Sequence, residues 1–355
     1  MKQKLKNANM SQMLLIAFLI VLLASVIPLG INPGMLYADC LVRIGMNGTF
    51  VLASMISIYC GAGLNFGLPI GIIAGLLGGA IAQEHNFVGL GGFLGACVIS
   101  IPFAVGFGWL YAKLLNNVKK GSEMSVGNYM AFSIVSLMSL MWLILPFKNP
   151  KVLWPLSGAG LRNTLTLEES YSAILDDYLR IDFKELGILQ NSAVFKDISI
   201  PSGLLLSFIL ICVLIWLFTK TKYGMMMRCC GGNYRFTEYM GISTKSIRTT
   251  GIIISTVLAA IGINIYSQSY GFYQFYSAPL MMAFPAMAAI LIGGATPKRA
   301  SVKNAVLGVI IFQSLMTVAT PVANALINAG TISEEIRKVI QNGVIIYALT
   351  KAREN

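Results

Sequence analysis

The sequence predicts an all-α, polytopic membrane protein of about ten transmembrane helices, with both termini in the cytoplasm. Of the 355 residues, 56% are hydrophobic and only 11% are charged, whereas charged residues make up about 25% of a typical soluble domain. Apolar runs of span length recur along the chain. The positive charges lie largely in loops and termini, as the positive-inside rule requires. We therefore expect a single transmembrane domain, residues 1–355.

The first half of the chain is expected to hold five spans. They lie at residues 13–29, 41–59, 66–82, 91–115 and 126–147. Lys2, Lys4 and Lys6 precede the first run, which lacks a cleavage site of small residues, so we expect an uncleaved span with its N-terminus inside. Arg43 lies near the outer end of the second predicted span, close enough for its side chain to reach water.

Residues 61–71, at the start of the third predicted span, are rich in glycine and contain a proline. Broken helices at membrane depth usually line a cavity buried in protein. Asn65 and Phe66 are therefore candidates for a substrate path, and Asn65 is the more informative because a buried amide needs hydrogen-bond partners. The alternative is that the glycines only allow helices to pack closely.

The longest polar interval covers residues 148–201 and is expected to be an extracytoplasmic loop insertion, by alternation of the spans. A small helix is predicted around residues 167–179, started by Thr166 and with its apolar side chains on one face. These apolar residues are Leu167, Tyr171, Ile174 and Tyr178. The interval also holds seven acidic residues, and we expect them to form a solvated face because no spacing singles out a catalytic pair. They are Glu168, Glu169, Asp176, Asp177, Asp182, Glu185 and Asp197.

The second half of the chain is expected to hold the remaining spans. They lie at residues 202–218, 251–265, 280–292, 305–322 and 336–349. The turn at residues 266–276 is rich in tyrosine and phenylalanine. Aromatic side chains favour the membrane interface, where they form a belt, but they also stack on sugar rings and nucleobases. On the second interpretation, Tyr273 and Phe275 join Asn65 and Phe66 in a candidate substrate path.

A basic stretch at residues 220–248 separates two of these spans. Its Lys and Arg residues are Lys220, Lys222, Arg228, Arg235, Lys245 and Arg248. At the bilayer centre they would together cost about 15–20 kcal/mol, so the stretch is expected to be a cytoplasmic loop.

The same loop has signals for a short helix. Gly231-Gly232 should break the incoming helix, and Asn233 is a good N-cap. Residues 234–240 can then form a helix, and Gly241 should end it in a left-handed conformation. Its aromatic side chains indicate either a partner protein or a helix folded back on the membrane domain.

Two segments carry a resemblance to a known family. The first contains Gly224, Arg228, Gly231-Gly232-Asn233 and Gly241-Ile242. It resembles the coupling loop of ABC-transporter permeases of the simple-sugar and branched-chain amino-acid type. The second, the sequence AAILIGGA at residues 288–295, is similar to the small-residue stretch of that family before a cytoplasmic turn. Phe236-Thr237 and Cys229 depart from the pattern, because the family usually has an Ala pair at the first position.

The resemblance implies a permease subunit of an ATP-driven importer in a bacterial inner membrane, surrounded by lipid. It also implies partners: ABC ATPase subunits, an extracytoplasmic substrate-binding protein, and a second permease copy or paralogue. The substrate would be a simple sugar, and relatives also carry nucleosides. The implied ATPase-coupling residues are Arg228, Gly231, Gly232, Asn233, Phe236, Glu238 and Gly241.

Other function classes are disfavoured by what the sequence lacks. No phosphate-binding G-x-x-x-x-G-K-[ST] loop occurs, so ATP hydrolysis would come from partner subunits. No hydrolase or protease motif indicates an enzyme, and one histidine without a cysteine or carboxylate cluster predicts neither a metal nor another cofactor. The net charge of +12 is explained by cytoplasmic loops rather than by nucleic-acid binding. A secondary transporter driven by an ion gradient is the alternative. The spans of such transporters usually carry ionisable residues, whereas the predicted spans of this chain are nearly free of charge, which counts against it.

Overall fold

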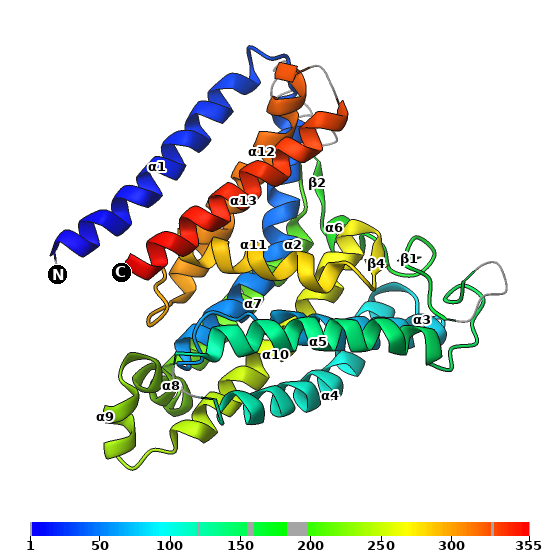
Figure 1. The fold of residues 1–355 in the computed structure, drawn as a ribbon. Helices are drawn as coiled ribbons and strands as arrows, with labels where there is room; N and C mark the ends of the chain where they lie inside the picture. The colour runs from blue at the N-terminus through cyan, green and yellow to red at the C-terminus, as the bar shows by residue number, and fades with distance from the viewer. Residues whose placement is uncertain (1, 119–120, 155–159, 183–197, 328–329, 355) are drawn as a thin grey trace.

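The computed structural model describes residues 2–118, 121–154, 160–182, 198–327 and 330–354. Within these residues the chain is mostly helical (Figure 1). The longer helices are α1 (Lys2–Val26), α2 (Pro33–Tyr59), α3 (Leu68–Glu84), α4 (Gly89–Leu115), α5 (Glu123–Ile144), α7 (Ser202–Lys220), α10 (Thr244–Tyr270), α11 (Ala278–Ile292), α12 (Val302–Ile327) and α13 (Gly330–Glu354). The short elements are β1 (Thr164–Thr166), α6 (Ile174–Asp177), β2 (Ile181–Asp182), β3 (Ser199–Ile200), α8 (Lys222–Gly232), α9 (Tyr234–Tyr239) and β4 (Phe272–Gln274).

Every predicted span lies on its own helix in the described part of the chain. Six of these helices are long and apolar enough to cross a membrane: α2, α4, α5, α7, α10 and α12. Shorter apolar helices occur at Gln12–Val26, Leu68–Glu84 and Ala278–Ile292. The chain is thus a multi-span membrane protein, while the count of about ten spans and the cytoplasmic placement of both termini stay predictions.

The start of α2 differs from the predicted one. Asn32 caps the helix, since its side-chain oxygen accepts hydrogen bonds from the backbone N–H groups of Gly34 at 3.0 Å and Met35 at 3.4 Å. Pro33 occupies the first turn, where its missing N–H costs nothing. The helix therefore begins eight residues before the predicted start at residue 41. Arg43 consequently lies well inside the helix instead of near its outer end, which corrects the expectation from the sequence.

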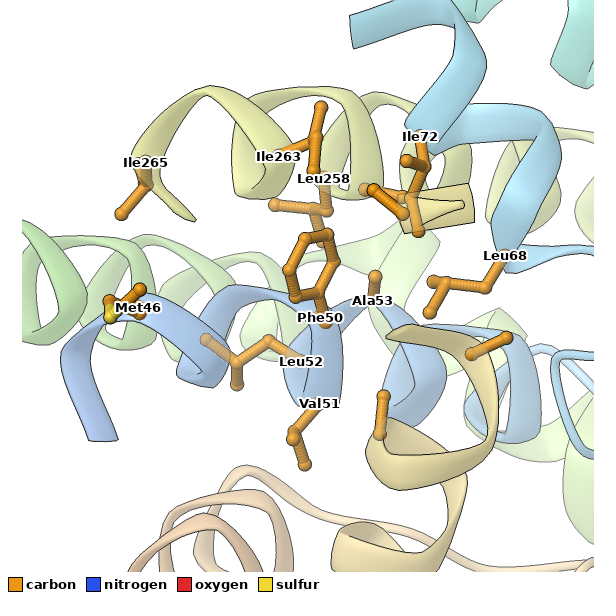
Figure 2. Packing of buried hydrophobic residues seen from close by; sticks show 14 of the residues in the cluster. Met46, Phe50, Val51, Leu52, Ala53, Leu68, Ile72, Leu258, Ile263 and Ile265 are labelled. Atoms are coloured by element: carbon orange, nitrogen blue, oxygen red, sulfur yellow. The ribbon is translucent and has the colours of Figure 1, made fainter. Parts of the chain in front are cut away.

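The core is built around α2, which is the most deeply buried of the six long spans. Figure 2 shows Phe50 of this helix pointing toward Leu258 and Ile263 of α10. Leu68 and Ile72 of α3 complete the same cluster. Each of these side chains is nearly or fully removed from solvent, and burial of one such side chain contributes about 1.5–3 kcal/mol.

Glycines bring α3 close to its neighbours α10 and α4. A Cβ on Gly71 would lie 2.5 Å from the Thr256 carbonyl oxygen of α10, and one on Gly78 would lie 2.1 Å from the Ser100 hydroxyl of α4. Only a residue without a side chain permits these approaches. The packing interpretation of the glycine-rich segment therefore holds at Gly71.

A small cap covers one end of the bundle. The cap consists of residues 148–154, 160–182 and β4, and its strands β1 and β4 pair antiparallel, with Leu165 opposite Tyr273. It lies on the right of Figure 1, whereas both chain ends and α8–α9 lie toward the left. Strands β2 and β3 pair in the same way. This arrangement agrees with the prediction that the loop at residues 148–201 and the basic stretch at residues 220–248 lie on opposite sides of the membrane. Which side each one faces stays a prediction.

The helix expected at residues 167–179 is not formed, and only α6 is helical there. Instead, the backbone N–H groups of Ser170, Tyr171 and Ser172 all donate to the Leu167 carbonyl in one tight turn. The Ala173 N–H then donates to the Gln268 carbonyl of α10 at 2.7 Å. Bonds to the end of α10 thus replace the helical ones, which a local periodicity of apolar residues does not reveal.

Of the acidic residues expected on a solvated face, Asp176 is the exception. It is 9% exposed, and burial raises the pKa of its carboxyl above the usual range. Glu168, Glu169, Asp177 and Asp182 keep contact with solvent, and Glu169 pairs with Lys151 at 2.6 Å. The expectation for Glu185 and Asp197 falls outside the described residues.

Candidate functional site

Helix α8 carries the first part of the predicted coupling loop. Thr221 caps it, because its hydroxyl oxygen accepts from the Gly224 N–H at 3.3 Å. One face of the helix is buried through Met227 and Cys230, which pack with Ile247 of α10 in a small apolar cluster. Arg228 and Cys229 lie on the exposed face. The helix is therefore anchored to the bundle along one side and open to solvent along the other.

The end of α8 approaches the end of α2 closely. A Cβ on Gly231 would lie 2.6 Å from the Tyr59 carbonyl oxygen. From the other side, Gly61 adopts the left-handed region with φ +80° and faces the Cys230 carbonyl. The incoming helix does end at Gly231-Gly232, as the sequence predicts, since Gly232 is the last residue of α8 and Asn233 is its C-cap. Gly231 has the further role of permitting the close contact with α2.

The short helix α9 follows as the sequence predicts. Asn233 is its N-cap, with its side-chain oxygen accepting from the Phe236 N–H at 3.1 Å. At the other end, Gly241 has φ +73°, and its N–H donates to the Glu238 carbonyl. The Ile242 N–H donates to the Thr237 carbonyl, so two consecutive N–H groups close the last turn in the manner of a Schellman cap.

One side of α9 rests on the protein and the other is exposed. Thr237 is fully buried, and Tyr234 packs against the apolar cluster around Cys230. Phe236, Tyr239 and Met240 are instead 54%, 89% and 63% exposed. A helix of this length is marginal in water without such support. The two interpretations of its aromatic residues, contact with a partner protein and packing on the membrane domain, therefore apply to different faces of one helix. We call its exposed face the α9 surface (Phe236, Glu238, Tyr239 and Met240).

A buried arginine behind the loop was not expected from the sequence. Arg248, in the second turn of α10, is 6% exposed, and its Nη2 lies 3.7 Å from Glu123 Oε1 at the start of α5. Its Nε and Nη2 atoms make no hydrogen bond in the described part of the chain. The Glu123 carboxylate is the negative charge that compensates it, so this ion pair connects the end of the predicted coupling loop to α5.

The path candidates Asn65 and Phe66 lie inside the bundle. The Asn65 amide donates to the Ser255 hydroxyl of α10 at 2.8 Å, and that hydroxyl donates to the Ala53 carbonyl of α2 at 2.7 Å. Phe66 is half-buried, with its ring 5.9 Å from that of Phe284 on α11. Asn65 thus has the hydrogen-bond partner that a buried amide needs, and contact of either residue with a solute stays a prediction.

Tyr273, in the cap strand β4, and Phe275, directly after it, are buried where the cap meets the bundle, and neither can form part of an interface belt. The Tyr273 hydroxyl donates to Asn264 Oδ1 of α10 and lies 3.1 Å from the Tyr171 hydroxyl. The Phe275 ring is 5.0 Å from that of Trp142 on α5. Both residues hold the cap on the bundle, and their contact with a solute likewise stays a prediction.

Several polar or aromatic side chains that were not selected from the sequence as site residues have solvent access. Three of them are Arg43 in α2 and the stacked pair Tyr266 and Tyr270 in α10. The N-cap residue Asn32 and the following Pro33 are the sequence signal for the true start of α2. A helix that begins there would have placed Arg43 inside the span. No cluster of His, Cys, Asp and Glu that could hold a metal occurs in the described residues.

Comparison with known proteins places this geometry in a family. The family described as "Branched-chain amino acid transport system / permease component" matches residues 9–349. Two curated relatives come from Lactococcus lactis subsp. cremoris (strain MG1363). The nucleoside ABC transporter permease protein NupB is 28% identical over 163 residues, which cover 45% of this chain and 42% of that protein. The permease protein NupC of the same description is 28% identical over 145 residues, covering 39% and 44%.

Each relative is matched over less than half of its own length. The family match, in contrast, spans nearly the whole chain, including both segments whose residues carry the resemblance. The chain therefore belongs to the ABC-transporter permeases of the branched-chain amino-acid and sugar type.

Proposed function

We propose that the chain is the membrane-spanning subunit of an ATP-driven importer of nucleosides. The observation that carries the substrate class is that both curated relatives are described as nucleoside ABC transporter permeases. This replaces the simple sugar as the preferred solute. The chain itself catalyses no reaction in this proposal, because its family provides the membrane subunit and a partner ATPase hydrolyses ATP.

The α9 surface is the proposed contact with that ATPase. Three large apolar side chains are exposed on one short capped helix, and such a cluster indicates a protein partner. Arg228 lies exposed on the adjacent α8 and adds a positive charge. The cap, at the other end of the bundle, is the proposed site for a substrate-binding protein, and a second permease copy completes the assembly.

Ion-driven transport is the second candidate, because Asp39 and Arg43 are ionisable residues within α2. The test is uptake of radiolabelled uridine and ribose by cells with and without the gene for this chain. We expect loss of uridine uptake alone on deletion, and uptake that survives a protonophore while ATP is maintained. Loss of ribose uptake alone on deletion would contradict the proposed substrate. Loss of uptake on addition of the protonophore at constant ATP would favour ion coupling.

A further inference from the structure

A polar stripe runs along the outer half of α2. Asp39, Arg43 and Asn47 are spaced four residues apart, so they share one face of the helix. Asp39 and Arg43 are exposed and Asn47 is half-buried. The two charged side chains form no ion pair in the described part of the chain, so neither neutralises the other by direct contact.

The position of Arg43 inside a span makes this exposure informative. It follows Pro33, the first residue of α2, by ten positions, which places it about 15 Å along the helix. A charged residue within a transmembrane helix almost always faces a water-filled cavity or a polar partner, because contact with hydrocarbon is costly. The stripe is therefore unsuited to a lipid-facing surface.

The next residue on this face, Phe50, leads to a series of aromatic rings on α10 and on strand β4, which follows it. Its ring is 6.3 Å from that of Tyr266, which stacks on Tyr270 at 5.3 Å with an interplanar angle of 26°. Phe272 continues the series, 4.7 Å from Tyr270. Tyr270 is 42% exposed, while Tyr266 and Phe272 are half-buried. These rings therefore offer faces that no side chain covers completely.

The stripe and the two tyrosine rings lie on adjacent helices that run in opposite directions. Ser255 of α10 bonds to Ala53 of α2, whereas Tyr266 contacts Phe50, so residue numbers rise along one helix as they fall along the other. From the contact between Phe50 and Tyr266, both series run toward the cap. We call the combined set the α2–α10 surface: Asp39, Arg43, Asn47, Tyr266, Tyr270 and Phe272.

We propose that the α2–α10 surface contacts the transported solute and selects a planar heteroaromatic ring bearing hydrogen-bonding groups. Aromatic rings stack on any nucleobase, because every base has a π-face. The carboxylate, guanidinium and amide supply acceptors and donors for the edges of the base and the hydroxyls of the sugar. This inference rests on the proposed nucleoside import, and it assigns the contact to residues other than the buried Tyr273 and Phe275.

The first test is protection of introduced thiols. Arg43→Cys and Tyr270→Cys are made in a Cys229→Ser background, since the remaining cysteines are buried or half-buried. The matched control is Tyr37→Cys, which is 52% exposed on a different face of α2. The assembled transporter in nanodiscs is treated with a charged maleimide, alone or with uridine or ribose. We expect labelling at positions 43 and 270, slowed several-fold by uridine but not by ribose, and no effect of uridine at position 37.

Each other outcome overturns the proposal. Failure to label positions 43 and 270 would mean that water does not reach the surface, and labelling that uridine does not slow would remove it from the solute path. Equal protection by ribose would contradict selection of a planar ring. A disulfide between two copies through position 43 would assign the stripe to an interface between permeases.

A second measurement separates this inference from the proposed function. Uridine uptake by the wild-type transporter is assayed on the same preparation, and its absence would contradict nucleoside import. With uptake established, Tyr270→Leu is expected to lower it about tenfold, the order expected for loss of one stacking ring. Tyr270→Phe keeps the ring and should transport normally, as should Tyr37→Leu. Normal uptake by Tyr270→Leu would overturn the α2–α10 surface while leaving nucleoside import intact.

Discussion

A single methyl group at the end of α8 should disrupt coupling. A Cβ at Gly231 would lie 2.6 Å from the Tyr59 carbonyl oxygen and 3.1 Å from that of Ile58. Ordinary contact begins at 3.4 Å, so Gly231→Ala must move α8 away from α2 by about 0.8 Å. Gly232 is the matched control, because nothing lies within 4 Å of its Cβ position and it occupies the same helix.

The energies of the two substitutions have opposite signs. Overpacking costs about 1–3 kcal/mol, whereas replacing glycine by alanine within a helix stabilises it by up to about 1 kcal/mol. Gly231→Ala should therefore lower stability by roughly 0–2 kcal/mol, and Gly232→Ala should leave it unchanged or raise it by about 1 kcal/mol. A change of up to about 2 kcal/mol between two conformational states corresponds to a change in coupling of up to about 30-fold.

The assay compares both variants in vesicles that contain the complete transporter. Solute-stimulated ATP hydrolysis and ATP-driven uptake are measured together, with the amount of copurified ATPase as the assembly control. We expect Gly231→Ala to reduce uptake per ATP hydrolysed and Gly232→Ala to match the wild type. Equal behaviour of the two variants would refute the argument that close contact of α8 with α2 positions the α9 surface.

The remaining predictions address the loop ends, the buried ion pair, the sidedness and the cap. Asn233→Ala removes the N-cap of α9, worth about 1 kcal/mol, and should weaken ATPase copurification; unchanged copurification would contradict a role for α9 in docking. Glu123→Gln leaves Arg248 buried without a compensating charge and should destabilise the protein by on the order of 3 kcal/mol, seen as a lower unfolding temperature in detergent, whereas an unchanged temperature would show that the ion pair contributes little. A thiol at Glu169 should react with an impermeant reagent on intact cells and one at Tyr239 should not, and the reverse pattern would invert the orientation. Burial raises the pKa of the Asp176 carboxyl in the folded protein, so the stability that its neutral form provides is complete below the ordinary pKa of 3.8 and is lost as the pH rises through the folded value. Asp176→Asn should accordingly raise the unfolding temperature at pH 7.5 more than at pH 4. An equal effect at both pH values would contradict this assignment.

Local signals in the sequence were sufficient for the helices that contain the predicted spans and for α9. Apolar runs mark the helices, and Asn233 and Gly241 mark the two ends of α9, because both caps depend on residues within one turn. The start of α2 was missed because Asn32-Pro33 lies in an apolar context where hydropathy, and not capping, set the predicted boundary.

The features that position the candidate site depend on contacts distant in sequence. The pairing of β1 with β4 places Leu165 opposite Tyr273, and Tyr273 is fully buried where the cap meets the bundle. No local pattern near Tyr273 distinguishes it from Tyr270, which remains partly exposed four residues from Tyr266. In the same way, the contact that requires glycine at position 231 involves the carbonyl of Tyr59, which no spacing within the coupling loop predicts.

The central claim is that this permease imports nucleosides with energy from ATP, and reconstituted transport tests it most directly. The chain, its ATPase and its substrate-binding protein are placed in sealed vesicles, and radiolabelled uridine is followed with ATP or a non-hydrolysable analogue on the ATPase side. Accumulation that requires hydrolysable ATP and is insensitive to an ionophore is the predicted result. Accumulation without ATP that an ionophore abolishes, or ATP-driven accumulation of ribose but not uridine, would contradict the account.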